Sequence, residues 1–268
     1  MEKGALIGKG MTSEVYEWGQ DKVLKLYFDN FSKDDRIKYE ADIGCKVYQA
    51  GIPSPAVFDI IALDGRKGLV FQRIFGNTIL NQLSVEPWKL FYYSTKLANL
   101  HFRIHKCSQI VLPSQQKRFE FTINLSSKVL GNRQKKILDY LGSLPDGTSI
   151  CHGDLHFNNV IVSNNKLFAI DWNGAYQGNP LGDVARTALI VISPSVPLGT
   201  PMIMGAISHP IKLITYWTYL GEYMRLANAN LSDIDSWILP VAAAKIKDNV
   251  PGEQNWLMDI IDTRLKKL

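Results

Sequence analysis

A chain of 268 residues, 46% of them hydrophobic, is long and apolar enough to bury a large core, which excludes a disordered protein. Its net charge of +5 comes from scattered basic residues without the runs that follow a phosphate backbone, so nucleic acid is not an expected partner. The three cysteines lack metal-ligand spacing, and neither a signal segment nor a bilayer-spanning apolar run is seen, which predicts a cytoplasmic protein without a membrane partner.

The first quarter of the chain predicts a sheet. Apolar runs at 5–7, 15–18 and 23–28 indicate three successive strands, and two more are expected at 56–63 and 69–74. The first turn is glycine-rich, and its amides and hydroxyls can cradle phosphates, although such a turn is at least as often only a turn. The candidate nucleotide-binding residues of this turn are Gly8, Gly10, Thr12 and Ser13.

Lys25 lies inside the third strand, where an unpaired ammonium group would be costly. The following segment, 32–50, predicts a helix with Ser32 as its N-cap and Gly51 as its terminator. Glu40 falls on the helix stripe that must pack against the sheet. A Lys25–Glu40 ion pair would satisfy both charges, either as a structural pair or as a device that directs Lys25 to the phosphates of a nucleotide.

The last of these strands ends near Gln72 and Ile74, whose backbone groups are candidates for contacting adenine, although an ordinary strand end is equally consistent with the local sequence. Beyond Gly76 the chain becomes mostly helical. The sequence therefore predicts an α+β fold with two lobes: residues 1–75 form an N-terminal nucleotide-binding lobe, and residues 76–268 form a larger lobe for catalysis and acceptor binding.

His101 and His105 lie four residues apart on a helix expected over 88–106, a spacing that can place two ligands on one metal. No carboxylate or third ligand accompanies them at a readable spacing. A structural role is therefore favoured over a metal site.

The stretch from Cys151 to Asn159 carries the strongest chemical signal. Asp154 and Asn159 stand in the D-x-x-x-x-N spacing with which phosphoryl-transfer enzymes place a base and a metal ligand on one loop. Asp171, which follows after a short hairpin, supplies a second metal carboxylate. Amide and carboxylate oxygens are the hard ligands that Mg²⁺ prefers.

The hairpin brings these two oxygen ligands together. Apolar runs at 160–162 and 167–170 flank a turn in which Asn164 and Asn165 tolerate the positive φ of a two-residue connection. The resulting register places Asn159 opposite Ile170, one residue before Asp171.

In their order, these motifs resemble the aminoglycoside phosphotransferase and choline kinase superfamily, which are small-molecule kinases with a protein-kinase-like fold. The resemblance spans residues 4 to 190 in motif order and is most specific in its second half. It rests on Gly8 to Ser13, Lys25, Glu40, Phe71 to Gly76, His152-Gly153-Asp154, Asn159, Asp171 and Gly182-Asp183-Val184-Ala185.

The resemblance implies ATP and Mg²⁺ as cofactors, a small-molecule hydroxyl as acceptor, and a role for each matching residue. Asp154 would be the catalytic base, and Asn159 and Asp171 would bind Mg²⁺. Lys25, oriented by Glu40, would contact the phosphates, while Gln72 and Ile74 would contact adenine through their backbones. Asp183 would anchor the catalytic loop as a structural residue.

The acceptor is the least constrained part of the prediction. Trp172 replaces the Phe-Gly of the protein-kinase metal loop and no Ala-Pro-Glu segment follows, which disfavours a protein substrate. The extended connection at 194–201 leads into a helix expected at 211–228 and would border the acceptor. A carboxylate there, such as Asp233 or Asp235, would suit an amine, so an aminoglycoside, amino sugar or amino alcohol is expected ahead of a neutral sugar or nucleoside.

Two alternatives remain open. A catalytically silent nucleotide-binding module would share the fold but would not need all of Lys25, Asp154, Asn159 and Asp171. A metal-dependent hydrolase would use His152, Asp154 and His156 as ligands, but it leaves Lys25, Glu40, Asn159 and Asp171 unexplained.

Overall fold

The computed structural model describes residues 3–107, 110–195 and 202–268. By compactness the chain forms two units. The smaller unit contains the chain up to Gln82 together with Phe157–Gly174, and the larger unit contains Leu83–His156 and the chain from Ala175 onward.

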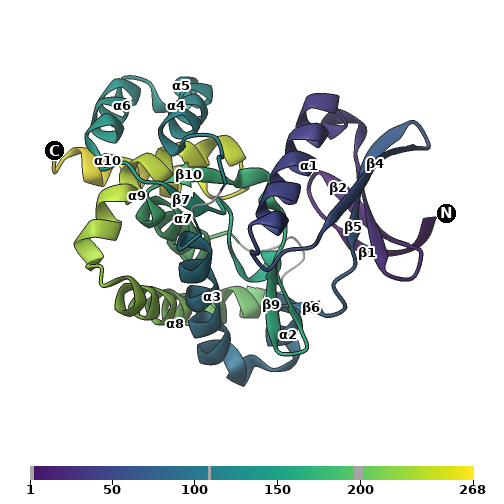
Figure 1. Ribbon diagram of the computed structural model, residues 1–268. Helices are drawn as coiled ribbons and strands as arrows, with labels where there is room; N and C mark the ends of the chain where they lie inside the picture. The colour runs from purple at the N-terminus through teal and green to yellow at the C-terminus, as the bar shows by residue number, and fades with distance from the viewer. Residues whose placement is uncertain (1–2, 108–109, 196–201) are drawn as a thin grey trace. The chain divides into compact units, whose positions relative to one another are not determined.

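The smaller unit is built on a five-stranded antiparallel sheet of strand order β1-β2-β3-β5-β4, with α1 along it (Figure 1). A three-stranded sheet of order β6-β8-β9 completes the unit, and α2 runs across its boundary. The elements are β1 (Lys3–Lys9), β2 (Ser13–Trp18), β3 (Lys22–Tyr27), η1 (Asp29–Phe31), α1 (Asp34–Gln49), β4 (Val57–Leu63), β5 (Arg66–Gln72), β6 (Asn77–Thr78), α2 (Ile79–Val85), η3 (Phe157–Asn159), β8 (Val160–Ser163), β9 (Lys166–Ala169) and η4 (Trp172–Gly174).

The five predicted strands are confirmed, with shifts at their ends. The last strand begins earlier than predicted, at Arg66, because the β4–β5 connection is only two residues long. Asp64 and Gly65 have φ of 53° and 75°, the left-handed conformation that a tight hairpin turn needs. The sheet buries Leu24, Leu26 and Val70 on one face and Tyr27 and Leu69 on the other.

Helix α1 begins later than predicted, and the assignment of Ser32 as its N-cap is wrong. Lys33 holds the N-cap position without a side-chain cap. The Ser32 hydroxyl instead accepts a hydrogen bond from the Lys67 amide at 3.0 Å, because it lies beside the sheet. The predicted end is confirmed: Gly51 has φ of 74°, and the amides of Gly51 and Ile52 close a Schellman motif on the last turn.

The larger unit is mostly helical. Helices α3 and α8 lie side by side, and α7 packs against α9 (Figure 1). The elements are η2 (Pro87–Lys89), α3 (Leu90–His105), α4 (Gln115–Leu125), α5 (Ser127–Leu130), α6 (Arg133–Ser143), β7 (Ser149–Cys151), β10 (Tyr176–Gly178), α7 (Pro180–Ile192), α8 (Met202–Ala227), α9 (Leu231–Lys245), η5 (Ile246–Asp248) and α10 (Gln254–Leu265).

Helix α9 forms the centre of the larger unit. Every residue from Trp237 to Lys245 is buried, which fits a helix that is apolar all round. Helix α7 starts with Asn179 as its N-cap, whose side chain accepts from the Leu181 amide, and with Pro180 in the first turn.

The compact units do not follow the two contiguous ranges expected from the sequence. The segment 157–174 groups with the N-terminal sheet because β8 pairs with β6 and the Ala169 amide donates to the Pro53 carbonyl at 2.8 Å. These contacts join residues that are far apart in the sequence, so no local sequence pattern predicts them. The boundary after residue 75 between functional lobes stays a prediction.

None of the helices in the described ranges combines the length and the apolar character that crossing a membrane requires.

Close packing of α1 on β4 yields a prediction about stability. A Cβ atom on Gly44 would lie 2.6 Å from Val57 Cγ2, whereas one on Gly221 of α8 would meet nothing within 4 Å. Gly44→Ala should therefore lower the free energy of unfolding by about 1–3 kcal/mol through overpacking. Gly221→Ala, the control, should raise it by about 1 kcal/mol through helix propensity. Chemical denaturation of both variants measures this, and equal stabilisation by both would contradict the contact.

Candidate functional site

The β8–β9 hairpin has the predicted register. Asn164 and Asn165 have φ of 48° and 61°, and Ser163 pairs with Lys166. The ladder continues to the hydrogen bond from the Ile170 amide to the Asn159 carbonyl, which is 2.9 Å long. Asn159 and Asp171 are therefore held at the same end of the hairpin.

Lys25 and Glu40 form the ion pair that the sequence predicts. Lys25 Nζ lies 2.6 Å from Glu40 Oε1, and the Tyr27 hydroxyl donates to Glu40 Oε2 at 2.5 Å. Both carboxylate oxygens are thus occupied, which fixes the side chain of Glu40. Tyr27 is a residue that the sequence analysis missed, although its position two residues from Lys25 places it on the same face of β3.

Asp171 is the second anion at Lys25. Its Oδ1 lies 3.0 Å from Lys25 Nζ and also accepts from Asn173 Nδ2 at 2.6 Å. Burial opposes the charge on Lys25, but the carboxylates of Asp171 and Glu40 outweigh it and raise the pKa of the ammonium group. The Asp171 backbone has φ of 65°, a conformation that aspartate tolerates better than most residues. The smaller unit therefore joins three predicted site residues.

The other predicted nucleotide-binding residues lie in and around the β1–β2 turn and at the end of β5. In the β1–β2 turn, the Gly10 amide donates to the Ser13 carbonyl at 2.9 Å, Gly8 lies in β1, and Ser13 is buried. The Thr12 carbonyl accepts from the Phe28 amide at 3.0 Å. Their contact with phosphates stays a prediction.

Gln72 ends β5, and its amide already donates to the Ala56 carbonyl at 2.8 Å. Ile74 follows just after the strand. Their contact with adenine, through a backbone carbonyl and amide of this segment, also stays a prediction.

In the larger unit, a buried carboxylate holds the start of the loop that carries Asp154. Asp183 accepts from the amides of His152 at 2.6 Å and Gly153 at 2.9 Å. Its Oδ2 also lies 2.9 Å from His101 Nε2 and 3.3 Å from His105 Nε2. These contacts match the anchoring role that the resemblance implies for Asp183.

The two histidines belong to this network. Their Nδ1 atoms meet the hydroxyls of Tyr219 and Tyr223 at 2.7 and 2.6 Å. The trio of His101, His105 and Asp183 has metal-ligand chemistry, but each candidate ligand atom already has a hydrogen-bond partner. The favoured structural role therefore fits the geometry better than a metal site does.

Asp154 follows this anchored segment and is surrounded by cationic and imidazole groups. Arg186 Nη2 lies 3.1 Å from its Oδ1, and His156 Nε2 lies 3.6 Å from its Oδ2. Burial opposes ionisation, but His156, Arg186 and His152 outweigh it and lower the pKa of Asp154. Arg186 was missed from the sequence, where its signal was that it is the one cation of helix α7, three residues after Asp183.

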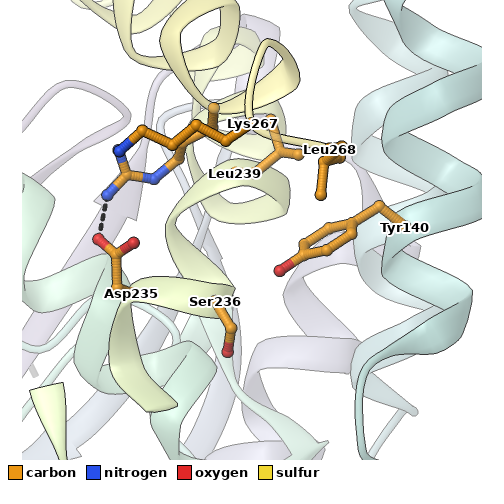
Figure 2. A pocket seen from close by; sticks show the side chains of 7 residues that line it. Tyr140, Asp235, Ser236, Leu239, Lys267 and Leu268 are labelled. Atoms are coloured by element: carbon orange, nitrogen blue, oxygen red, sulfur yellow. Dashed lines mark hydrogen bonds and ion pairs between the residues drawn. The ribbon is translucent and has the colours of Figure 1, made fainter. Parts of the chain in front are cut away.

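The carboxylates expected at the acceptor are engaged elsewhere. Asp233 accepts from the Asn230 amide in a capping box at the start of α9. Asp235 pairs with Arg264 beside a cavity of about 100 Å³, which Figure 2 shows between α6, α9 and the end of the chain. Asp235 lines that cavity, whereas none of the residues predicted for catalysis, nucleotide binding or metal binding does. Of the expected connection at 194–201, residues 196–201 lie outside the described residues.

The imidazole of His105 yields a pH prediction. Burial, and next the neighbouring His101, lower its pKa from the ordinary 6.5 to about 4. As the pH falls, His105 therefore takes up a proton in the unfolded chain at a higher pH than in the folded protein. Its contribution to the free energy of unfolding is complete above pH 6.5. That contribution is lost as the pH falls toward 4, by about 1.4 kcal/mol per pH unit. Denaturation between pH 7.5 and 5 should show this slope, and His105→Gln should flatten it. His209→Gln, on the exposed surface of α8, controls for removal of a histidine, and an unchanged slope in His105→Gln would contradict the assignment.

Comparison with solved structures identifies the fold. An aminoglycoside-3'-phosphotransferase of type VIII is 16% identical over 92% of each chain, with a TM-score of 0.62. The enzyme APH(3'')-Id from Streptomyces rimosus is 14% identical over 91% of this chain and 92% of its own, with a TM-score of 0.59. A streptomycin-ATP-APH(2")-IIa ternary complex is 16% identical over 99% of this chain and 91% of its own, with a TM-score of 0.51. The expected protein-kinase-like α+β fold is confirmed.

Comparison of sequences identifies the family. No curated protein matches the chain at a significant level. Residues 3–200, well over half of the chain, match the family described as the phosphotransferase enzyme family. This match includes every motif on which the resemblance rests. The chain therefore belongs to the phosphotransferase enzyme family.

Proposed function

We propose that this protein transfers the γ-phosphoryl group of ATP to a hydroxyl group of a small molecule in a Mg²⁺-dependent reaction. The observation that carries the proposal is Lys25, held by Glu40 at 2.6 Å and by Asp171 at 3.0 Å. A purely structural pair would need one carboxylate. A second carboxylate, 42% exposed, instead supports a cation that can exchange toward phosphate oxygens.

The donor set fits a magnesium ion. Asp171 offers an exposed carboxylate and Asn159 an amide oxygen, and the hairpin fixes both at one end. When bound, Mg²⁺ would neutralise charge on the phosphate oxygens of the nucleotide. The two residues would hold it, and Lys25 would add a second positive charge at the phosphates.

Asp154 serves as the base in this proposal. The acceptor oxygen forms a bond to the γ-phosphorus, the bond from phosphorus to the leaving oxygen of ADP breaks, and the hydroxyl proton passes to Asp154. Because the transition state is loose, orientation of the hydroxyl contributes more than proton removal. A carboxylate whose pKa is lowered is ionised at neutral pH and can therefore accept the hydrogen bond that orients the acceptor hydroxyl.

The alternatives receive less support. In a metal-dependent hydrolase, His152 would direct a ring nitrogen to the metal, but its Nδ1 accepts from the Asp154 amide at 3.2 Å. A silent nucleotide-binding module would not need a base, yet Asp154 is ionised and linked to Arg186.

A cytoplasmic location is part of the proposal.

The two aspartates should have separable roles. Asp154→Asn should reduce turnover by about 10²–10⁴-fold while the dissociation constant of the Mg-nucleotide changes little, because the base contacts the acceptor. Asp171→Asn should weaken Mg-nucleotide binding itself. Calorimetric titration and single-turnover assays measure both, with Asp259→Asn on the exposed face of α10 as a control. Equal loss of nucleotide affinity in both variants would refute the assignment.

The acceptor class is tested by a screen for nucleotide consumption. We expect an aminoglycoside, amino sugar or amino alcohol, since the neighbour with ATP also holds streptomycin. Asp233 and Asp235 no longer support this preference, because both have other partners. The screen should include neutral sugars and nucleosides, and also GTP because a GDP complex exists for another structure of this fold. Mass spectrometry locates the phosphate, and selective turnover of neutral acceptors would overturn the preference for amines.

A further inference from the structure

Helix α7 presents three consecutive contacts to the catalytic loop. Asp183 accepts from the amides of His152 and Gly153, and the Thr187 hydroxyl donates to the Leu155 carbonyl at 2.8 Å. Arg186 lies between these two on the helix and contacts the residue between them on the loop, Asp154. Positions i, i+3 and i+4 share one helix face, so this face follows the loop residue by residue.

The contact of Arg186 continues to a second carboxylate. Its Nη2 atom lies 3.1 Å from Asp154 Oδ1 and 2.9 Å from Asp248 Oδ2. Asp248 ends η5, outside the residues that match the family, and its Oδ1 is 3.1 Å from Lys247 Nζ. One guanidinium nitrogen therefore bridges the two aspartates.

We propose that Arg186 is a positioning residue, held by Asp248, that sets the orientation and the charge of the catalytic base Asp154. The proposal rests on the proposed function, because it assigns a role through Asp154. It makes the last quarter of the chain a part of the catalytic arrangement, through a single side chain in η5.

The burial pattern favours positioning over a simple clamp. The side chain of Arg186 is 15% exposed, and its buried Nε has no hydrogen-bond partner among the described residues. A cross-link selected for stability alone would be expected to use its donors more fully. The Asp154 side chain, by contrast, is 37% exposed. Arg186 therefore places its positive charge against Asp154, which is the more exposed of the two carboxylates that it bridges.

The bridge also accounts for the charge balance at the base. His156 and Arg186 together hold Asp154 ionised, and Asp248 compensates part of the guanidinium charge of Arg186. The titratable and charged groups around Asp154 and its bridge are His152, His156, Tyr176, Arg186, Lys247 and Asp248.

Kinetics of Arg186 variants test the proposal. Arg186→Met should lower kcat by about 10²-fold while KM and Kd for the nucleotide stay within about threefold, since the loss acts through the base. Its acid limb in the pH profile of kcat should move upward by one unit or more. Arg186→Lys should recover part of kcat by restoring the charge, and Asp248→Asn should give a smaller loss of about tenfold. Arg133→Met, which breaks the ion pair with Asp262 in the same unit, is the control and should leave kcat unchanged.

Two results would overturn the inference. One is a wild-type kcat and acid limb in Arg186→Met. The other is a parallel fall of kcat, nucleotide affinity and melting temperature with an unmoved acid limb, which is the signature of a structural clamp.

The Asp154→Asn variant separates this inference from the proposed function. If Asp154→Asn retains turnover, the base assignment itself fails. If Asp154→Asn is inactive while Arg186→Met behaves as wild type, only the positioning role fails. In the double variant, Arg186→Met should add no further loss to Asp154→Asn, because both act on one group. Additive losses would count against the inference.

Discussion

The carboxylate of Asp183 is the constraint on which the loop that carries Asp154 depends. A buried carboxylate is expensive, on the order of several kcal/mol, unless its lone pairs are satisfied. Two loop amides and two imidazoles satisfy it, and two tyrosine hydroxyls hold the imidazoles in turn. Asp183 lies on helix α7 and accepts the hydrogen bonds of both loop amides. The backbone that leads into Asp154 is therefore held in a single orientation. Helices α3, α7 and α8 are thereby tied to the same two loop amides.

The smaller unit contains a cation, Lys25, whose positive charge also needs compensation. Its buried cation, Lys25, is compensated by Glu40 from a helix and by Asp171 from a hairpin. Glu40 is buried and its second oxygen is occupied by Tyr27, whereas the side chain of Asp171 is 42% exposed. Glu40 sets the position of the Lys25 ammonium group. The contact with the more exposed Asp171 can be replaced by a contact with a phosphate oxygen. A cation that binds a ligand needs one contact that fixes its position and one that the ligand can replace, and Lys25 has both kinds.

The sequence predicted those parts of the structure that short-range rules determine. Alternation and turn chemistry defined the hairpin down to the Asn159–Ile170 contact, and the cost of a buried charge required a partner for Lys25. Ser32 was misassigned because a tertiary contact with Lys67 competes with capping. The Arg186–Asp248 contact joins residues 62 positions apart, which no local pattern reveals. The acceptor remained open for the same reason, since charged side chains in the last quarter are paired by tertiary packing.

The two-residue turn of the β8–β9 hairpin has a consequence for how the chain can vary in length. Side chains alternate between the faces of a strand, so one inserted or deleted residue within the ladder would move every later side chain to the opposite face. Asp171 would then leave the side on which it meets Lys25. Natural length variation in relatives should therefore avoid the segment from Asn159 to Asp171 and collect in connections such as those that precede β7 or follow α7.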